Sequence, residues 1–171
     1  MRQLTSRGLT LVELMIGAVI LAIAIVSLLG AFMAQMALNE HARNQALATN
    51  DAARVMEELR RQNSGAGCTA PSAAAPAGFA NWNAWLADTT ANGGGGKSVQ
   101  PTPNTNELIA VTATGADPLT VTVAACWRQR ERTIGECTWN GAALAANPGA
   151  GGNPAVTESP AELSTLLTCR R

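Results

Sequence analysis

The distribution of apolar and polar residues divides the chain into three parts. Positions 1–8, MRQLTSRG, are short and polar, a long apolar run follows, and the remainder is mixed. Between Glu13 and Glu40 there is no charged residue, and Leu, Ile, Val, Ala and Met dominate positions 14–38. Because a helix of about 20 apolar residues crosses a bilayer, this pattern predicts a transmembrane helix over 14–38.

The helical pattern continues beyond the apolar run. Positions 39–63, NEHARNQALATNDAARVMEELRRQN, contain no Pro or Gly and are rich in helix formers. Their weak apolar stripe consists of Ala42, Ala46, Ala53, Val55, Met56 and Leu59. The pair Ser64-Gly65 supplies a stop signal. We therefore expect one helix over 9–63, roughly 80 Å long, whose outer half packs on a head formed by 64–171.

The first part of the head is rich in loops. The stretch NWNAWLADT predicts a short helical turn with Trp82 and Trp85 on one side. The next stretch, ANGGGGKSVQPTPNTN, is expected to be a flexible connector. It resembles a phosphate-binding loop only superficially, because the spacing GxxxxGK[ST] is absent.

Three stretches then have the character of strands, at 107–114, 119–129 and 132–140. The second alternates well, so that one face carries Leu119, Val121, Val123, Ala125 and Trp127. Positions 141–159 are expected to be a loop, and 161–169 a closing strand or helix. The predicted fold class is α+β, with a very long N-terminal helix packed on a small antiparallel sheet with irregular loops.

The cysteines lie on one side of the apolar run. They are Cys68, Cys126, Cys137 and Cys169. An even number fits two disulfides in an oxidising compartment. Arg2 and Arg7 precede the apolar run, which by the positive-inside tendency keeps the N-terminus cytoplasmic and sends the head outward. The charge pattern and the cysteines therefore indicate the same orientation.

Four cysteines allow three disulfide pairings. If 119–132 folds as a tight hairpin, pairing Cys126 with Cys137 puts Glu131-Arg132 at the turn, and both cysteines then share a face with Trp139. Cys68 and Cys169 would then tie the loop after the long helix to the C-terminus. We favour this pairing slightly, and the other two stay open.

Composition and charge exclude several classes of function. Lys and Arg number 12, as do Asp and Glu, so no general role in nucleic-acid binding follows. The one histidine, His41, is far from the cysteines, and their spacing does not match a zinc site. We find no nucleophile–base pair, carboxylate dyad or metal cluster, and we expect no enzymatic activity, cofactor or metal.

A cluster of cations around the predicted hairpin turn is a candidate anion contact. Arg128, Arg130 and Arg132 lie there beside Trp127, an arrangement that could meet phosphates or another anionic surface. The alternative is a solvated turn, which we favour.

The N-terminal stretch RGLTLVE, followed by an uninterrupted apolar helix, resembles the processing signal of type IV pilins and of the pseudopilins of type II secretion. The resemblance covers roughly 1–63. It implies cleavage after Gly8 by a prepilin peptidase and N-methylation of Leu9, the new first residue. The family most often has Phe after the cut and a proline in mid-helix, where this chain has Leu9 and Gly30. The second departure suggests a minor pilin or a pseudopilin.

Glu13 fits this processing scheme physically. Cleavage would create an α-amine at Leu9, one helical turn before the Glu13 carboxylate. In a bundle of identical helices, an unpaired carboxylate is costly, whereas one that faces a neighbour's amine is compensated. Glu13 would therefore set the axial register of assembly. The alternative is an interfacial acid in an ordinary membrane anchor.

The resemblance implies a structural subunit of a type IV pilus-like filament, most plausibly a minor pilin. Before assembly it would span the bacterial inner membrane once, with its head in the periplasm. Its partners would be the prepilin peptidase, other pilin subunits and an inner-membrane assembly platform. A type II secretion pseudopilin and a tip adhesin or DNA-uptake pilin are alternatives. An ordinary secretory signal is a weaker one, because no small-x-small cleavage site follows the apolar run.

Overall fold

A computed structural model describes residues 10–99, 107–129, 132–147, 156–157 and 161–169. The chain forms two compact units, 1–41 and 42–171. One α-helix, α1 (Leu11–Gln62), begins in the first unit and ends in the second. The remaining elements all belong to the second unit, in which they build an α+β head.

In the first unit, α1 begins after Thr10. The Thr10 hydroxyl oxygen accepts a hydrogen bond from the Glu13 amide at 3.3 Å, and the Thr10 carbonyl accepts one from the Leu14 amide at 3.2 Å. The order Thr-x-x-Glu at a helix start is a capping box, in which the Thr side chain satisfies an otherwise unpaired amide. From there α1 runs without a break through Gly30.

In the second unit, one face of α1 is buried. Its buried residues are Asn44, Ala48, Asp51, Ala52, Val55, Met56 and Leu59. The expected apolar stripe was wrong in part, because Ala42, Ala46 and Ala53 are exposed. Alanines occur around the whole circumference of this segment, so hydrophobicity alone could not choose the face. Two polar residues, Asn44 and Asp51, occupy positions on it that the stripe did not include.

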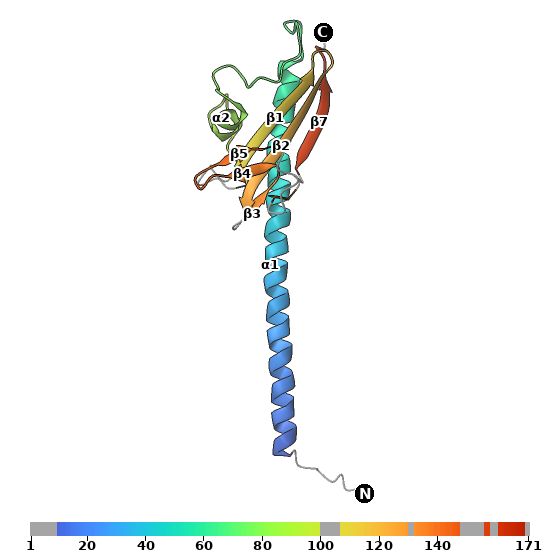
Figure 1. The fold of residues 1–171 in the computed structure, drawn as a ribbon, viewed down its shortest axis with the longest axis vertical. Coiled ribbons are helices and arrows are strands. Elements are labelled where there is room, and N and C mark those ends of the chain that lie inside the picture. Colours follow the sequence, from blue (N-terminus) through green and yellow to red (C-terminus); the bar gives the residue numbers. More distant parts are fainter. Residues whose placement is uncertain (1–9, 100–106, 130–131, 148–155, 158–160, 170–171) are drawn as a thin grey trace. The chain divides into compact units, whose positions relative to one another are not determined.

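The main sheet has five strands. These are β1 (Glu107–Gly115), β2 (Leu119–Gln129), β3 (Arg132–Ile134), β6 (Val156–Thr157) and β7 (Glu162–Leu167). β2 pairs with β1 along one side, from Glu107 opposite Trp127 to Gly115 opposite Leu119. Along its other side β2 pairs antiparallel with β3 and β7, and β6 adds to β3 in parallel (Figure 1).

A second sheet of two strands, β4 (Cys137–Trp139) and β5 (Leu144–Ala146), follows β3. The expectation of one strand over 132–140 was therefore wrong, because the chain bends at Gly135. This glycine has a φ of 96°, and a Cβ added to it would lie 2.8 Å from the Cys126 Cβ. Only glycine tolerates both conditions, so the strand ends here.

The described elements correct three further expectations. The register pairs Gln129 with Arg132, so Arg132 belongs to β3 and not to the turn expected at Glu131-Arg132; residues 130–131 lie outside the described residues. The expected loop 141–159 contains β5 and β6. The closing segment, which the sequence left as strand or helix, is strand β7.

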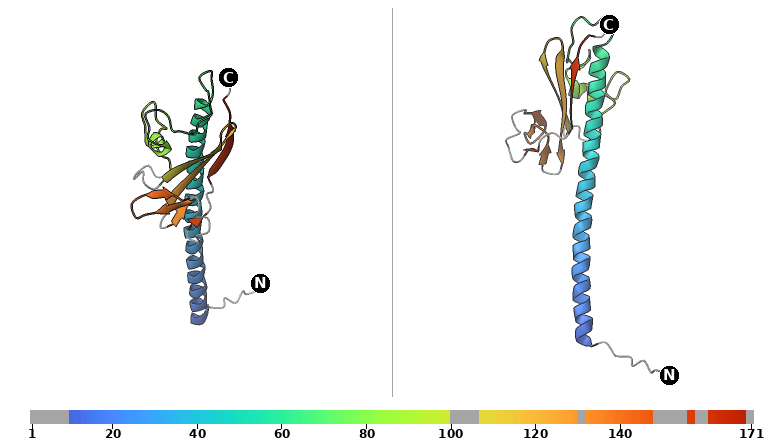
Figure 2. Two further views of the ribbon diagram at one scale, coloured as in Figure 1. Left: turned by 45° about the horizontal axis from the view of Figure 1, so that its top comes forward. Right: turned by 90° about the vertical axis from the view of Figure 1, so that its right-hand side faces the viewer.

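The head contains two apolar clusters on opposite faces of the main sheet. The larger one joins the buried face of α1 to the inner face of β2, whose five alternating residues from Leu119 to Trp127 are all buried, as predicted. The smaller one contains Cys126, Cys137 and Leu144, with Trp139 packed against it. Figure 2 shows the resulting layers in the head: outer part of α1, main sheet, and β4–β5.

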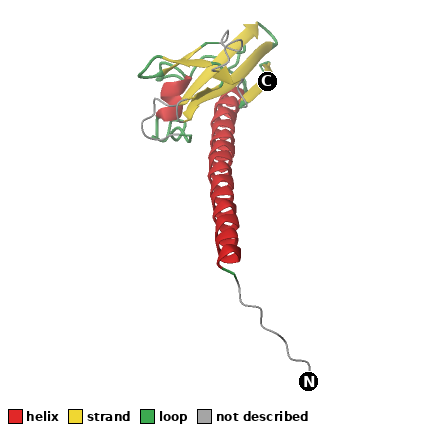
Figure 3. Ribbon diagram, turned by 60° about the horizontal axis from the view of Figure 1, so that its bottom comes forward, coloured by secondary structure: helices red, strands yellow, loops and turns green. Residues whose placement is uncertain are grey.

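The short helix α2 (Trp82–Ala87) lies beside β1 and is seen with the sheet in Figure 3. Its start is capped by the Asn81 side chain, which accepts from the Ala84 amide at 2.9 Å. The Asn83 amide group bonds to both the N–H and the C=O of Ile109, each at 2.8 Å. One side chain thus replaces a neighbouring strand at this point of the sheet edge.

Candidate assembly helix and buried polar cluster

The first part of α1 presents an apolar surface. Its large apolar side chains between Leu11 and Leu38 are between 50% and 75% exposed. The helix reaches a mean hydropathy of 2.7 over an 18-residue window, and none of that window is buried inside the structure. By length and composition this helix could cross a membrane, whose hydrocarbon core needs about 20 such residues.

Glu13 interrupts this surface in the first turn of α1. Unpaired amides at a helix start favour a negative charge there, and the hydrogen bond to Thr10 places Glu13 at the third position of the capping box. A Glu at position 13 is therefore compatible both with capping the helix and with the proposed role in assembly. The predicted cleavage and methylation positions, Gly8 and Leu9, lie outside the described residues.

The four cysteines form two disulfides. Cys68 is joined to Cys169 with a Cα–Cα distance of 5.4 Å, and Cys126 to Cys137 with a distance of 6.2 Å. This is the pairing that the sequence slightly favoured. The second bond does not lie across one strand pair as expected. It connects β2 of the main sheet to β4 of the small sheet, because the chain bends between β3 and β4.

The structure does not gather the three predicted cations into one site. The Arg128 guanidinium lies 4.4 Å from the centre of the Trp139 ring, a cation–π contact. Arg132 is exposed at the start of β3, and Arg130 lies outside the described residues. Arg128 is therefore engaged within the head.

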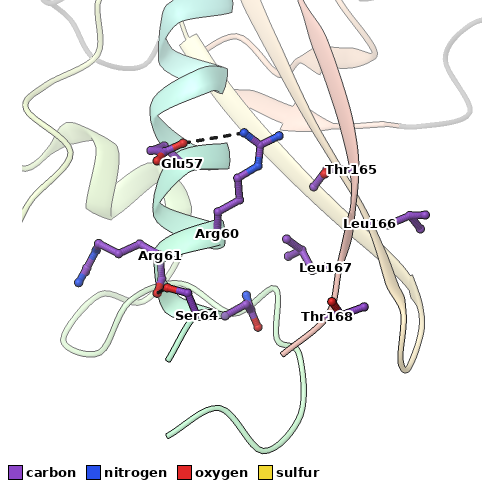
Figure 4. A pocket seen from close by; sticks show the side chains of 9 residues that line it. Glu57, Arg60, Arg61, Ser64, Thr165, Leu166, Leu167 and Thr168 are labelled. Carbon is purple, nitrogen blue, oxygen red and sulfur yellow. Dashed lines mark hydrogen bonds and ion pairs between the residues drawn. The ribbon is translucent and has the colours of Figure 1, made fainter. Parts of the chain in front are cut away.

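A groove of about 600 Å³ lies between the last turns of α1 and β7 (Figure 4). Arg61 donates to the Glu58 carboxylate at 2.6 and 2.7 Å, and this pair lowers the pKa of Glu58. Arg60 lies 3.9 Å from Glu57. Each of these two cations has a carboxylate one turn before it on the same helix, so the groove does not concentrate charge of one sign.

A cluster of polar residues in the head is built around Asp51, which is fully buried on α1. One of its oxygens accepts from Arg54 and from the Ser98 hydroxyl, the latter at 2.7 Å. The other accepts from the Ser98 amide at 2.6 Å. Arg54 also donates to the carbonyls of Gly94 and Gly96, the latter at 2.6 Å. Asp51 and Arg54 thus bind α1 to the glycine-rich loop.

The same cluster reaches the start of β1 through Glu107, which is 1% exposed. Its Oε2 accepts from the Val99 amide at 3.2 Å, and its backbone carbonyl accepts from the Lys97 ammonium at 2.6 Å. Burial, reinforced by the Asp51 carboxylate, raises the pKa of Glu107 to about 8. Burial also lowers the pKa of Lys97.

The glycine-rich loop is therefore held in place as far as Val99, and the expected flexible connector was wrong there. The amides of Gly94 and Gly96 donate to the carbonyls of Trp85 and Leu86 at 2.7 and 2.8 Å. The rest of that stretch, 100–106, lies outside the described residues. The sequence did not indicate how this loop is held, because its partner on α1, Arg54, is 40 and 42 positions away from the two glycines that it binds.

A weak signal for the cluster was present in the sequence. Asp51 follows Ala48 by three positions and precedes Val55 by four, which places it on the buried face of a helix. A buried acid requires a partner, and Arg54 follows one turn later. Nothing local, however, indicated Lys97 or Glu107.

The described residues contain no group of three or more His, Cys, Asp or Glu side chains that could hold a metal ion. Comparison of the chain with known protein families, with curated proteins and with solved structures gave no match.

Proposed function

We propose that the chain is a structural, non-enzymatic subunit of a type IV pilus-like filament, a minor pilin, processed by a prepilin peptidase and assembled through its apolar N-terminal helix. The observation that carries this proposal is one acid, Glu13, in the first turn of an exposed apolar helix, directly after the RGLTLV stretch. An exposed surface of this size needs a cover, which a membrane supplies before assembly and neighbouring helices supply afterwards.

The head supports the same proposal. The later turns of α1 carry core residues of the head, so the helix that would enter the filament is covalently and structurally part of the head. Two disulfides fit a head on the oxidising side of the membrane. A pseudopilin of type II secretion would share all of these features, and the genes beside this one distinguish the two systems.

The N-terminal mass of the protein tests this proposal. We expect co-expression with a prepilin peptidase to yield a product that begins at Leu9 and carries one added methyl group. Gly8→Val should leave a full-length precursor in the membrane. Gly17→Ala is the matched control, because a Cβ there meets nothing within 4 Å, and it should be trimmed normally. A filament subunit that still begins at Met1 would contradict the proposal.

A further inference from the structure

A buried carboxyl oxygen that no donor faces marks the junction of α1, the loop 93–99 and β1. Glu107 Oε1 has no hydrogen-bond partner among the described residues, whereas Oε2 accepts from the Val99 amide. Asp51 and Glu107 accept from the consecutive amides of Ser98 and Val99, at 2.6 and 3.2 Å, so both carboxyl groups meet the loop at the same point. If both carboxyl groups were ionised, their charges would repel each other in a buried site where water does not screen them. Neither group would then have a hydrogen to donate to the other.

We propose that Asp51 and Glu107 hold one proton between them, and that this proton latches the loop 93–99 to α1 and β1. The proton belongs on Glu107. Asp51 already accepts hydrogen bonds from Arg54 and Ser98, which stabilise its negative charge. A protonated Glu107 donates from Oε1 to Asp51 and still accepts the Val99 amide at Oε2, so every oxygen of the pair is satisfied.

The charged groups around this carboxyl pair come from each neighbouring element. Arg54 extends from α1 and Lys97 from the loop, and both are cations. At the end of α2, Asp88 is engaged in its own turn. On β2, Arg128 stacks on Trp139 at the other face of the sheet. Arg54 bonds directly to Asp51, whereas the Lys97 ammonium bonds to the backbone carbonyl of Glu107. The proton removes the negative charge of the Glu107 carboxyl itself.

The proton makes the head's stability depend on pH. The pKa of Glu107 is raised from an ordinary 4.5 to about 8 by burial and by Asp51. Between these values the folded chain holds a proton that the unfolded chain releases. The folding equilibrium constant therefore falls by up to about tenfold per pH unit across this window and levels off above it. This holds whether or not the chain enters a filament.

Unfolding of the full chain in detergent tests the latch. The four tryptophans, at 82, 85, 127 and 139, all lie in the head, so their fluorescence follows the head alone. We compare the wild type with Glu107→Gln, whose side-chain amide replaces the proton, and with Glu57→Gln, an exposed control. The wild type and the control should lose stability between pH 5.5 and 8. In Glu107→Gln the folding equilibrium constant should depend less on pH, by a factor of about ten per pH unit.

Infrared spectroscopy of the wild type provides a second test that needs no variant to fold. A carboxyl group that is still protonated at pH 7 should give its carbonyl stretch, and titration should remove this band near pH 8. Absence of the band at pH 7, or a Glu107→Gln variant that keeps the wild-type slope, would overturn the proposal. The second result would assign the slope to another group.

Discussion

Glu13 occupies a position at which two physical roles require similar chemistry. It closes the capping-box sequence Thr10-x-x-Glu13, and its amide donates to the Thr10 hydroxyl at the start of α1. As the proposed partner of a neighbour's α-amine, it would set the register of assembly. A capping box accepts Gln in place of Glu, because both side chains can accept a hydrogen bond, whereas an ion pair with an amine requires the charge. One substitution therefore separates the two roles.

For Glu13→Gln we expect normal membrane insertion, normal trimming and unchanged helix content, because the cap is kept. Incorporation into filaments should fall about tenfold or more, since the neighbour's amine loses its counter-charge inside an apolar bundle. Quantitative immunoblotting of sheared filaments measures it, with Glu57→Gln as the control. Wild-type incorporation of Glu13→Gln would leave Glu13 only a capping role.

Gly94 is another single position with a sharp requirement. A Cβ there would lie 2.6 Å from the Leu86 Cα and 3.0 Å from the Trp85 ring. Gly94→Ala should therefore destabilise the head by about 1–3 kcal/mol, the usual cost of overpacking. Gly67→Ala is the control, because nothing lies within 4 Å of its added Cβ. Thermal unfolding followed by tryptophan fluorescence compares the two, and equal melting temperatures would refute the packing argument.

Individual elements differ in how far the sequence predicts them. β2 was predicted over its observed bounds. The alternation of apolar and polar residues with a period of two is visible in the local sequence, and the apolar positions form the buried face of the strand. The end of β3 could not be predicted in this way. It depends on how closely Gly135 approaches Cys126 on the paired strand, and this distance exists only once the sheet has formed.

The helix α1 shows the same division between local and non-local information. Its length follows from a continuous run of helix formers, and its end follows from the glycine at 65, whose φ is 102°. Its buried face, however, was assigned by apolar residues and so omitted Asp51. That side chain is buried because Arg54 and Ser98 compensate it, and Ser98 reaches it only in the folded head. The polar cluster was missed because its members are far apart in the sequence. The cysteine pairing was favoured because Cys126 and Cys137 lie in strands that follow each other along the chain.

In the whole molecule, the two disulfides constrain very different lengths of chain. Cys68–Cys169 spans a sequence separation of 101 residues, and Cys126–Cys137 one of 11. In the chain-entropy view, closing a longer loop removes more freedom from the unfolded chain, about 4.7 kcal/mol for the first and about 3 kcal/mol for the second. Besides its four Trp, the head has one Phe, Phe79, and no Tyr, so these constraints are large relative to the stability of a small domain.

We therefore expect the double variant Cys68→Ser/Cys169→Ser to lose more stability than Cys126→Ser/Cys137→Ser. The expected difference is about 2 kcal/mol by the entropy of loop closure. Denaturant unfolding of both full-length variants in the same detergent measures this difference, and the two variants serve as each other's control. A larger loss in the second variant would show that joining the two sheets matters more than closing the long loop.

The Cys68–Cys169 bond also bears on how the molecule withstands proteases. A single peptide bond hydrolysed anywhere between these cysteines leaves both fragments attached through sulfur. The nicked polypeptide would migrate as one band without a reductant and as two with it. A cut in an exposed loop of the head would thus not release the C-terminal strand. That strand would stay joined, through the disulfide, to the segment that follows α1.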